Sequence, residues 1–155
     1  MARLRVGIVG AGSIAELHAK GYLDHPRADI VAICDPDEDL AIKRSLDWGA
    51  RRYYTDYDEF IRDADVDAVV ILTPNYLHAR QAVAALEAGK HVSMERPIAT
   101  SIPDADAVLR AQQASGKVLQ VFEPSLFYKP LLDARNLIDA GEIGKPTALR
   151  ISATV

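Results

Sequence analysis

The N-terminal part of the chain carries a strand, a glycine turn, a helix and a second strand, in that order. Residues 4–9 form an apolar strand pattern that runs directly into the glycine turn at 10–12 and a helical stretch. A second strand pattern, residues 30–34, ends at Asp35. This order and spacing predict a dinucleotide-binding unit, because the turn admits a pyrophosphate and the acid binds a ribose hydroxyl.

Each position of the turn has a physical role in that prediction. Gly10 allows the tight turn out of the strand, and Gly12 lets the backbone approach a pyrophosphate closely. Ala15, where a third glycine is often found, still permits close packing of helix on strand. The helix start at Ser13 and Ile14 offers unpaired N–H groups and a positive dipole end. The alternative is a plain glycine turn without a cofactor, which the acid after the second strand argues against.

The composition excludes several classes of protein. The 155 residues suit one domain, and with 49% hydrophobic and 26% charged residues nothing suggests disorder or a coiled coil. The net charge of −4, without a long basic cluster, argues against nucleic acid. No apolar run reaches the roughly 18 residues of a membrane span. The one cysteine, Cys34, cannot form an internal disulfide, so we expect the protein to be located in the reducing cytoplasm. We expect Cys34 itself to be a small core residue.

Strand and helix patterns alternate along most of the chain, which predicts an α/β fold with a doubly wound parallel sheet. The spacing of Ser13 and Glu16 predicts that a capping box starts the first helix. The expected strands lie at 4–9, 30–34, 52–54, 68–72, 91–94 and 118–122. The expected helices lie at about 13–23, 38–48, 58–62, 77–88, 103–115 and 130–140.

The C-terminal residues have a different pattern. Apolar and polar residues alternate from Leu149 to Val155, which is typical of a strand with one face in water. We therefore expect a dinucleotide-binding domain at 1–122, a connecting segment and helix at 123–146, and the first strand of a second α/β domain at 147–155. A lone strand is unstable, so we expect a longer parent protein or pairing with another copy. The alternative is an edge strand of the main sheet.

Two further groups of polar residues follow strands of the predicted sheet. Thr73 and Asn75 come after the fourth strand, with Asn75 as a plausible N-cap and His78 in the first helical turn. The helix dipole disfavours an imidazolium there, so we expect a neutral His78 that exchanges hydrogen bonds with cofactor or substrate. Taken alone, His78 is more often a helix-surface residue. Glu95 and Arg96 follow the fifth strand and should also face the crevice, as an ion pair or as groups that orient nicotinamide and substrate.

These residues together resemble one known family. The shared motifs, in chain order, are Gly10-Ala11-Gly12, Asp35, Thr73-Pro74-Asn75 with His78, residues 89–92, Glu95-x-Pro97 and residues 141–144. This pattern resembles the N-terminal half of the glucose–fructose oxidoreductase, inositol dehydrogenase and rhizopine catabolism (Gfo/Idh/MocA) family, over essentially the whole chain.

The resemblance implies a Rossmann domain followed by an α/β domain with an open sheet, through which many relatives pair. It implies a nicotinamide cofactor and hydride transfer at a sugar or polyol hydroxyl. We expect no metal site. The resemblance assigns cofactor contacts to Gly10, Gly12, Ser13, Ile14, Asp35, Thr73, Asn75, His78, Glu95 and Arg96. It also implies that the peptide before Pro97 is often cis.

Two departures from the family pattern limit these expectations. The family lysine is Arg96 here, and arginine keeps its charge where lysine exchanges protons, so a catalytic role for Arg96 is weaker than a binding role. The family's catalytic histidine and aspartate belong to the second domain, so we expect this chain alone to bind cofactor without a complete active site. The alternatives are a non-catalytic, NAD-binding regulatory protein and a glycosidase that uses NAD transiently.

The acidic residues after the second strand predict the choice of cofactor. Asp35 is followed by Asp37, Glu38 and Asp39, and no basic residue comes before Lys43. A ribose 2′-phosphate would be repelled there, while a 2′-hydroxyl donates to Asp35. We therefore expect NAD rather than NADP.

Overall fold

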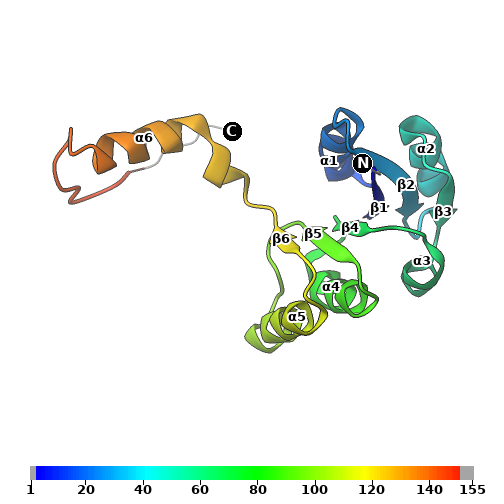
Figure 1. The fold of residues 1–155 in the computed structure, drawn as a ribbon. Coiled ribbons are helices and arrows are strands. Elements are labelled where there is room, and N and C mark those ends of the chain that lie inside the picture. The colour runs from blue at the N-terminus through cyan, green and yellow to red at the C-terminus, as the bar shows by residue number, and fades with distance from the viewer. Residues whose placement is uncertain (1–2, 151–155) are drawn as a thin grey trace. The chain divides into compact units, whose positions relative to one another are not determined.

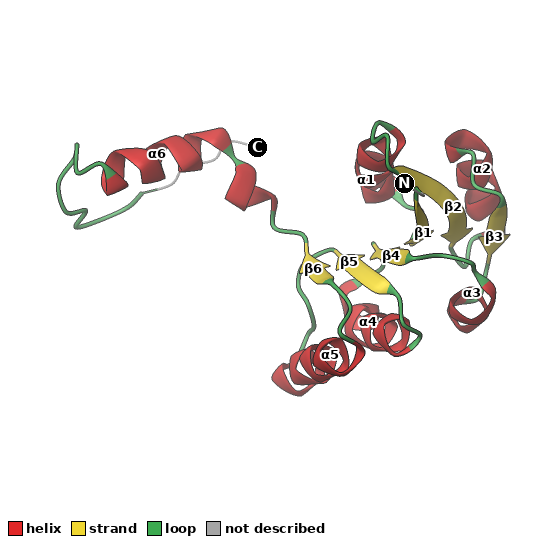
Figure 2. Ribbon diagram, in the orientation of Figure 1, coloured by secondary structure: helices red, strands yellow, loops and turns green. Residues whose placement is uncertain are grey.

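Six parallel strands form one sheet in the computed structural model, which describes residues 3–150. The strand order is β3-β2-β1-β4-β5-β6, so the first and fourth strands are neighbours at the centre (Figure 2). The strands are β1 (Leu4–Val9), β2 (Ala28–Cys34), β3 (Arg52–Tyr54), β4 (Ala68–Ile71), β5 (His91–Met94) and β6 (Leu119–Val121). This order, in which the chain reverses direction across the sheet between β1 and β4, confirms the doubly wound fold.

Five helices pack on the two faces of this sheet (Figure 1). They are α1 (Ser13–Leu23), α2 (Glu38–Trp48), α3 (Tyr57–Asp63), α4 (His78–Glu87) and α5 (Ile102–Ser115), with a 3₁₀ turn η1 (Asn75–Leu77) before α4. The bounds of α1 and α2 are those the sequence predicts. Near Asn75 the prediction is wrong, because η1 begins there and the asparagine is not a side-chain cap.

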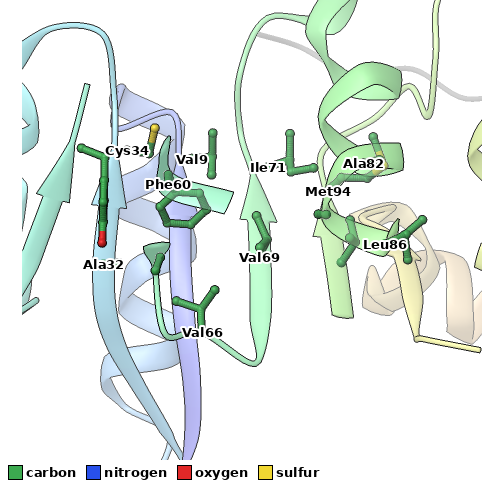
Figure 3. Packing of buried hydrophobic residues seen from close by; sticks show 14 of the residues in the cluster. Val9, Ala32, Cys34, Phe60, Val66, Val69, Ile71, Ala82, Leu86 and Met94 are labelled. Atoms are coloured by element: carbon green, nitrogen blue, oxygen red, sulfur yellow. The ribbon is translucent and has the colours of Figure 1, made fainter. Parts of the chain in front are cut away.

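The core consists of two clusters, one on each side of the sheet. On one side, Ala15 and Ala19 of α1 and Ala41 of α2 pack against β1, β2 and β4. On the other side, Phe60, Leu86 and Val108 bring α3, α4 and α5 onto the sheet. Figure 3 shows Phe60 among buried residues of β1 and β4 in the second cluster. Because both faces of β4 are buried, its sequence is a continuous apolar run.

Side chains and glycines define the helix ends. Asp37, Asp56 and Ser101 accept hydrogen bonds from the first turns of α2, α3 and α5. The predicted capping box at Ser13 is wrong, because Ser13 is the first helical residue and Gly12 is the N-cap without a side-chain hydrogen bond. Glu16, its predicted partner, pairs with Arg44 instead. The start of α1 therefore keeps its N–H groups free of a side-chain cap.

Contacts along the chain separate it into two compact units, residues 1–122 and 123–155. Within the second unit, a 3₁₀ turn η2 (Pro124–Phe127) precedes α6 (Lys129–Asp139). Residues 147–150 have no assigned strand, and 151–155 lie outside the described residues. A strand is stable only beside a partner strand, so the strand expected at 147–155 stays a prediction. Between residues 3 and 150, no helix combines the length and apolar character needed to cross a membrane.

Candidate functional site

The carboxyl ends of β1, β2, β4 and β5 meet at one edge of the sheet. The Gly10 N–H donates to the Cys34 carbonyl at 2.8 Å, and the Leu72 N–H donates to the Val9 carbonyl at 2.8 Å. The Glu95 N–H donates to the Ile71 carbonyl at 3.0 Å. The loops that follow these four strands are therefore held side by side, and all the predicted site residues lie in or directly after them. This edge, at the switch point of the strand order, is where doubly wound sheets bind ligands.

Gly10 and Gly12 serve different purposes in the turn. Gly10 has a φ of +88°, and a Cβ there would lie 2.8 Å from the carbonyl carbon and oxygen of Leu72. The fold itself therefore requires glycine at position 10. Gly12 has an ordinary φ of −65°, and a Cβ there would meet no atom within 4 Å. Neither the backbone nor the packing explains Gly12, which leaves open space directly at the uncapped start of α1.

Asp35 links the second strand end to the glycine turn. Its Oδ2 accepts a hydrogen bond from the Ala11 N–H at 2.7 Å, and its Oδ1 accepts one from the Asp37 N–H at 3.0 Å. The partly buried carboxylate keeps further lone pairs for a hydroxyl donor, because each oxygen can accept more than one bond. Asp35 thus lies beside the glycine turn, and its role in binding a ribose stays a prediction.

Arg44 is a residue of this site that the sequence argument overlooked. Its Nε donates to the Ala11 carbonyl at 3.2 Å, and its guanidinium lies 5.3 Å from the centre of the Trp48 ring. The cation pairs with Glu16 and, at 3.7 Å, with Asp47. Two carboxylates therefore balance the positive charge of Arg44. Its hydrogen bond to Ala11 braces α2 against the glycine turn. No spacing in the sequence indicates this contact, which joins residues 33 positions apart.

His78 begins α4, in the first helical turn as the sequence predicts, and it is buried rather than the helix-surface residue of the alternative interpretation. Its side chain is fully buried, with Nδ1 2.7 Å from the Pro97 carbonyl and Nε2 2.8 Å from the Thr73 carbonyl. A neutral ring donates to one of these oxygens and a charged ring to both. The ring thus joins the loop after β4 to the loop after β5 through its contacts with these two carbonyls. Any effect of His78 on a cofactor or substrate would therefore act through the position of these two loops.

A second polar contact supports the same loop. The Thr73 hydroxyl donates to Oε1 of Gln81, a nearly buried residue of α4. The Tyr57 hydroxyl donates to the Gln81 carbonyl at 2.6 Å, and burial raises the pKa of Tyr57, which keeps this hydroxyl protonated. Gln81 is absent from the sequence prediction, although its position one turn after His78 on the same helix face would have indicated it. Asn75, by contrast, is exposed at the start of η1.

Glu95 and Arg96 form the turn after β5. Glu95 accepts the Arg96 N–H at 3.1 Å through Oε2, and its Oε1 lies 3.0 Å from Nε2 of His18 in α1. The peptide between Arg96 and Pro97 is cis, as the family resemblance implied. Arg96 is exposed. His18 is another residue that the sequence argument overlooked.

Cys34 is placed as a core residue, as expected. It is buried at the end of β2, and burial raises the pKa of its thiol to about 12. A thiol with so high a pKa is neutral at physiological pH and a poor nucleophile. Within residues 3–150, no group of three or more histidine, cysteine or carboxylate side chains is arranged to hold a metal ion.

Comparisons with known proteins agree with this fold. A family model described as an oxidoreductase family with an NAD-binding Rossmann fold, GFO_IDH_MocA, matches residues 4–123. The 4-carboxy-2-hydroxymuconate-6-semialdehyde dehydrogenase of Sphingobium sp. strain SYK-6 is 36% identical over 140 residues, which cover 90% of this chain and 44% of that protein. The inositol 2-dehydrogenase of Salmonella typhimurium is 37% identical over 147 residues, which cover 92% and 44%.

A solved structure gives the same result for the fold. The scyllo-inositol dehydrogenase of Lactobacillus casei, crystallised with NAD(H) and scyllo-inositol, superposes with a TM-score of 0.86 at 28% identity. The match covers 92% of this chain and 43% of that one. The chain therefore spans less than half the length of the relatives it matches.

Proposed function

Because the chain belongs to the oxidoreductase family with the NAD-binding Rossmann fold, we propose that it is the cofactor-binding part of a dehydrogenase. The full reaction is a hydride transfer between NAD and a sugar or polyol hydroxyl. Support for this substrate class comes from relatives named as inositol dehydrogenases, of which one was crystallised with scyllo-inositol. The relatives are more than twice as long as this chain, so catalysis is expected to need residues outside these 155.

The open space at Gly12 is the single observation that carries the cofactor assignment. A glycine that the apo fold does not need, at the uncapped N-terminus of α1, fits a pyrophosphate that approaches the backbone closely. The Ser13 and Ile14 N–H groups then bind phosphate oxygens, and Asp35 accepts from the adenosine ribose. Thr73, Asn75 and Glu95 lie toward the nicotinamide end, with His78 holding their loops together.

NAD, once bound, supplies the hydride acceptor, and this chain's residues position and hold the reactants. Arg96 is exposed in the turn after β5, which supports a role for its guanidinium in binding a substrate oxygen. It stays charged at any relevant pH and does not exchange protons. We therefore assign Arg96 a binding and orienting role, and we expect proton transfer to depend on the second domain.

A direct test of the cofactor assignment replaces Gly12 by alanine. We expect G12A to lower NAD affinity at least about tenfold, because the methyl group occupies the pyrophosphate space, while the free energy of unfolding changes by about 1 kcal/mol or less. Isothermal titration and thermal unfolding measure the two quantities. The matched control is G21A in α1, whose new methyl group also meets open space and which should bind NAD normally. An unchanged NAD affinity in G12A would contradict the cofactor assignment.

Cofactor choice is tested by titrating NAD and NADP against the same chain. We expect NAD to bind at least about tenfold more tightly, because Asp35 and Asp37 would repel a 2′-phosphate. Arg44 does not offset this repulsion, since Glu16 and Asp47 already pair with it. Equal or tighter binding of NADP would refute the preference.

A second candidate is a non-catalytic, NAD-binding regulatory protein. The arginine at position 96, where the family pattern has lysine, favours this alternative because it removes a proton-exchanging group. Assays of the longer parent protein with inositols and other polyols discriminate the two. NADH formation supports the dehydrogenase, and tight NAD binding without turnover supports the regulator.

We also propose that the parent protein is cytoplasmic and forms homo-oligomers through its second-domain sheet. The single, buried cysteine is typical of a reducing compartment. The alternating pattern at 147–155 is typical of a strand in an open sheet, the kind of surface through which copies pair. Cell fractionation and light scattering of the parent protein test these two points.

A further inference from the structure

His18 of α1 and Glu95 after β5 are 77 positions apart and meet at the site edge. The His18 Nε2 lies 3.0 Å from Glu95 Oε1, and only 9% and 20% of the two side chains are exposed. A carboxylate is an acceptor only, so Nε2 is the donor in this bond. We propose that His18 is a positioning residue that holds Glu95 for the nicotinamide end of the cofactor. The proposal rests on the proposed NAD-binding function.

The surroundings of His18 hold its ring in one place. The ring packs edge-on against Phe122, which follows β6, with 4.8 Å between the centroids and an interplanar angle of 62°. Along α1, Ile14 and Tyr22 lie one turn before and after His18, and all three line a groove of about 800 Å³ with Ser93, Gln120 and Phe122. Because Phe122 packs against the ring of His18, the ring is held with its Nε2 directed at Glu95. This arrangement differs from that of a surface histidine with a solvated ring.

Among residues 3–150, His18 is the one side chain that hydrogen-bonds to the Glu95 carboxylate, so the orientation of this carboxylate depends on the histidine. Its Oε2 accepts only the N–H of the next residue, Arg96, at 3.1 Å. Its backbone N–H is fixed to Ile71 at 3.0 Å, so the strand end is held while the side chain depends on His18. Without that donor, the carboxylate is free to turn toward water. The Glu95–His18 bond therefore connects the helix that begins at the pyrophosphate turn with the loop at the nicotinamide end.

The test compares NAD with ADP-ribose, which has the same adenosine and pyrophosphate but lacks the nicotinamide ring. Isothermal titration gives both affinities for the 155-residue chain and for the matched pair H18Q and H18N. The glutamine amide reaches the position of Nε2, whereas the shorter asparagine amide does not. We expect H18N to weaken NAD binding about tenfold and ADP-ribose binding less than twofold. H18Q should retain both affinities to within about threefold.

A double-mutant cycle assigns the effect to Glu95. E95A should weaken NAD binding as H18N does, and the H18N/E95A double variant should bind no worse than E95A alone, because both changes remove one interaction. Additive losses, an unchanged NAD affinity in H18N, or equal losses for NAD and ADP-ribose would each overturn the positioning role. If H18N fails to fold, H18L with E95A repeats the cycle. A wild-type chain that binds neither nucleotide refutes the proposed function itself, which is a separate outcome.

Discussion

Two neighbouring tyrosines, Tyr54 and Tyr57, differ in the hydrogen bonding of their hydroxyl groups. The hydroxyl of Tyr54, at the end of β3, is buried and has no hydrogen-bond partner among the described residues. The hydroxyl of Tyr57, at the start of α3, donates to the Gln81 carbonyl at 2.6 Å. Both rings pack against Phe60, with centroids 5.6 and 6.1 Å away. The residues thus share an aromatic cluster and differ in what their hydroxyls contact.

We predict opposite effects on stability when each tyrosine loses its hydroxyl. Y54F should leave the free energy of unfolding unchanged or raise it by up to about 1–2 kcal/mol, because a buried polar group without a partner is removed. Y57F should lower it by about 1 kcal/mol, because the Gln81 carbonyl loses its donor. Urea unfolding of the two variants measures both values. A larger loss for Y54F than for Y57F would contradict this account.

The positions of several residues were predictable from the sequence because they depend on local structure. Gly10, Asp35 and Cys34 lie where the pattern placed them, because a turn and two strand ends determine their positions. His78 begins α4 as predicted. Its contacts with the carbonyls of Thr73 and Pro97 could not be predicted, because these carbonyls belong to loops joined only in the folded chain.

At the scale of elements, an ion pair between Arg5 of β1 and Asp67, the residue before β4, joins these two central strands at the edge opposite the site. The Asp67 carboxylate accepts the Arg5 backbone N–H at 2.9 Å and two guanidinium bonds at 3.1 and 2.7 Å. The side-chain hydrogen bond from Arg5 is the main cause that lowers the pKa of Asp67 to about 2. Because 35% of the Asp67 side chain is exposed, solvent screens the pair and we expect a contribution of about 1 kcal/mol or less.

This pair makes the stability of the fold sensitive to acid. Asp67 has a lower pKa in the folded chain than in the unfolded chain, where it is roughly 4, so its stabilising effect is complete above about pH 4 and is lost as the pH falls toward 2. We predict that D67N reduces stability at neutral pH and reduces the loss between pH 4 and 2. Urea unfolding at several pH values measures both. Parallel pH curves for wild type and D67N would contradict the prediction.

The elements themselves were largely predictable. The helices α1 and α2 and the strands β1, β3 and β5 have the predicted bounds, because amphipathic periodicity and glycine stops act within a few residues. The capping of α1 was not predictable from the Ser13–Glu16 spacing, because Glu16 pairs with Arg44 of another helix.

At the scale of the whole molecule, the chain spans less than half the length of the relatives it matches. If the proposal is correct, the 155-residue chain binds NAD but forms no NADH with myo-inositol or scyllo-inositol. Titration and the absorbance of NADH measure these two properties on one preparation. The longer parent protein serves as the control. NADH formation by the short chain would show that Arg96 and its neighbours suffice for the reaction.

The sequence by itself determined the succession of strands and helices along the chain, the glycine turn and the acid that follows β2. These features depend on hydrogen bonds and apolar spacing between residues close in the chain, which a pattern records. Only the tertiary structure decided that Gly12 faces open space, that Arg44 braces the turn, and that His18 reaches Glu95. Those contacts join residues from different elements, and their partners are chosen by the packing of the sheet rather than by spacing along the chain.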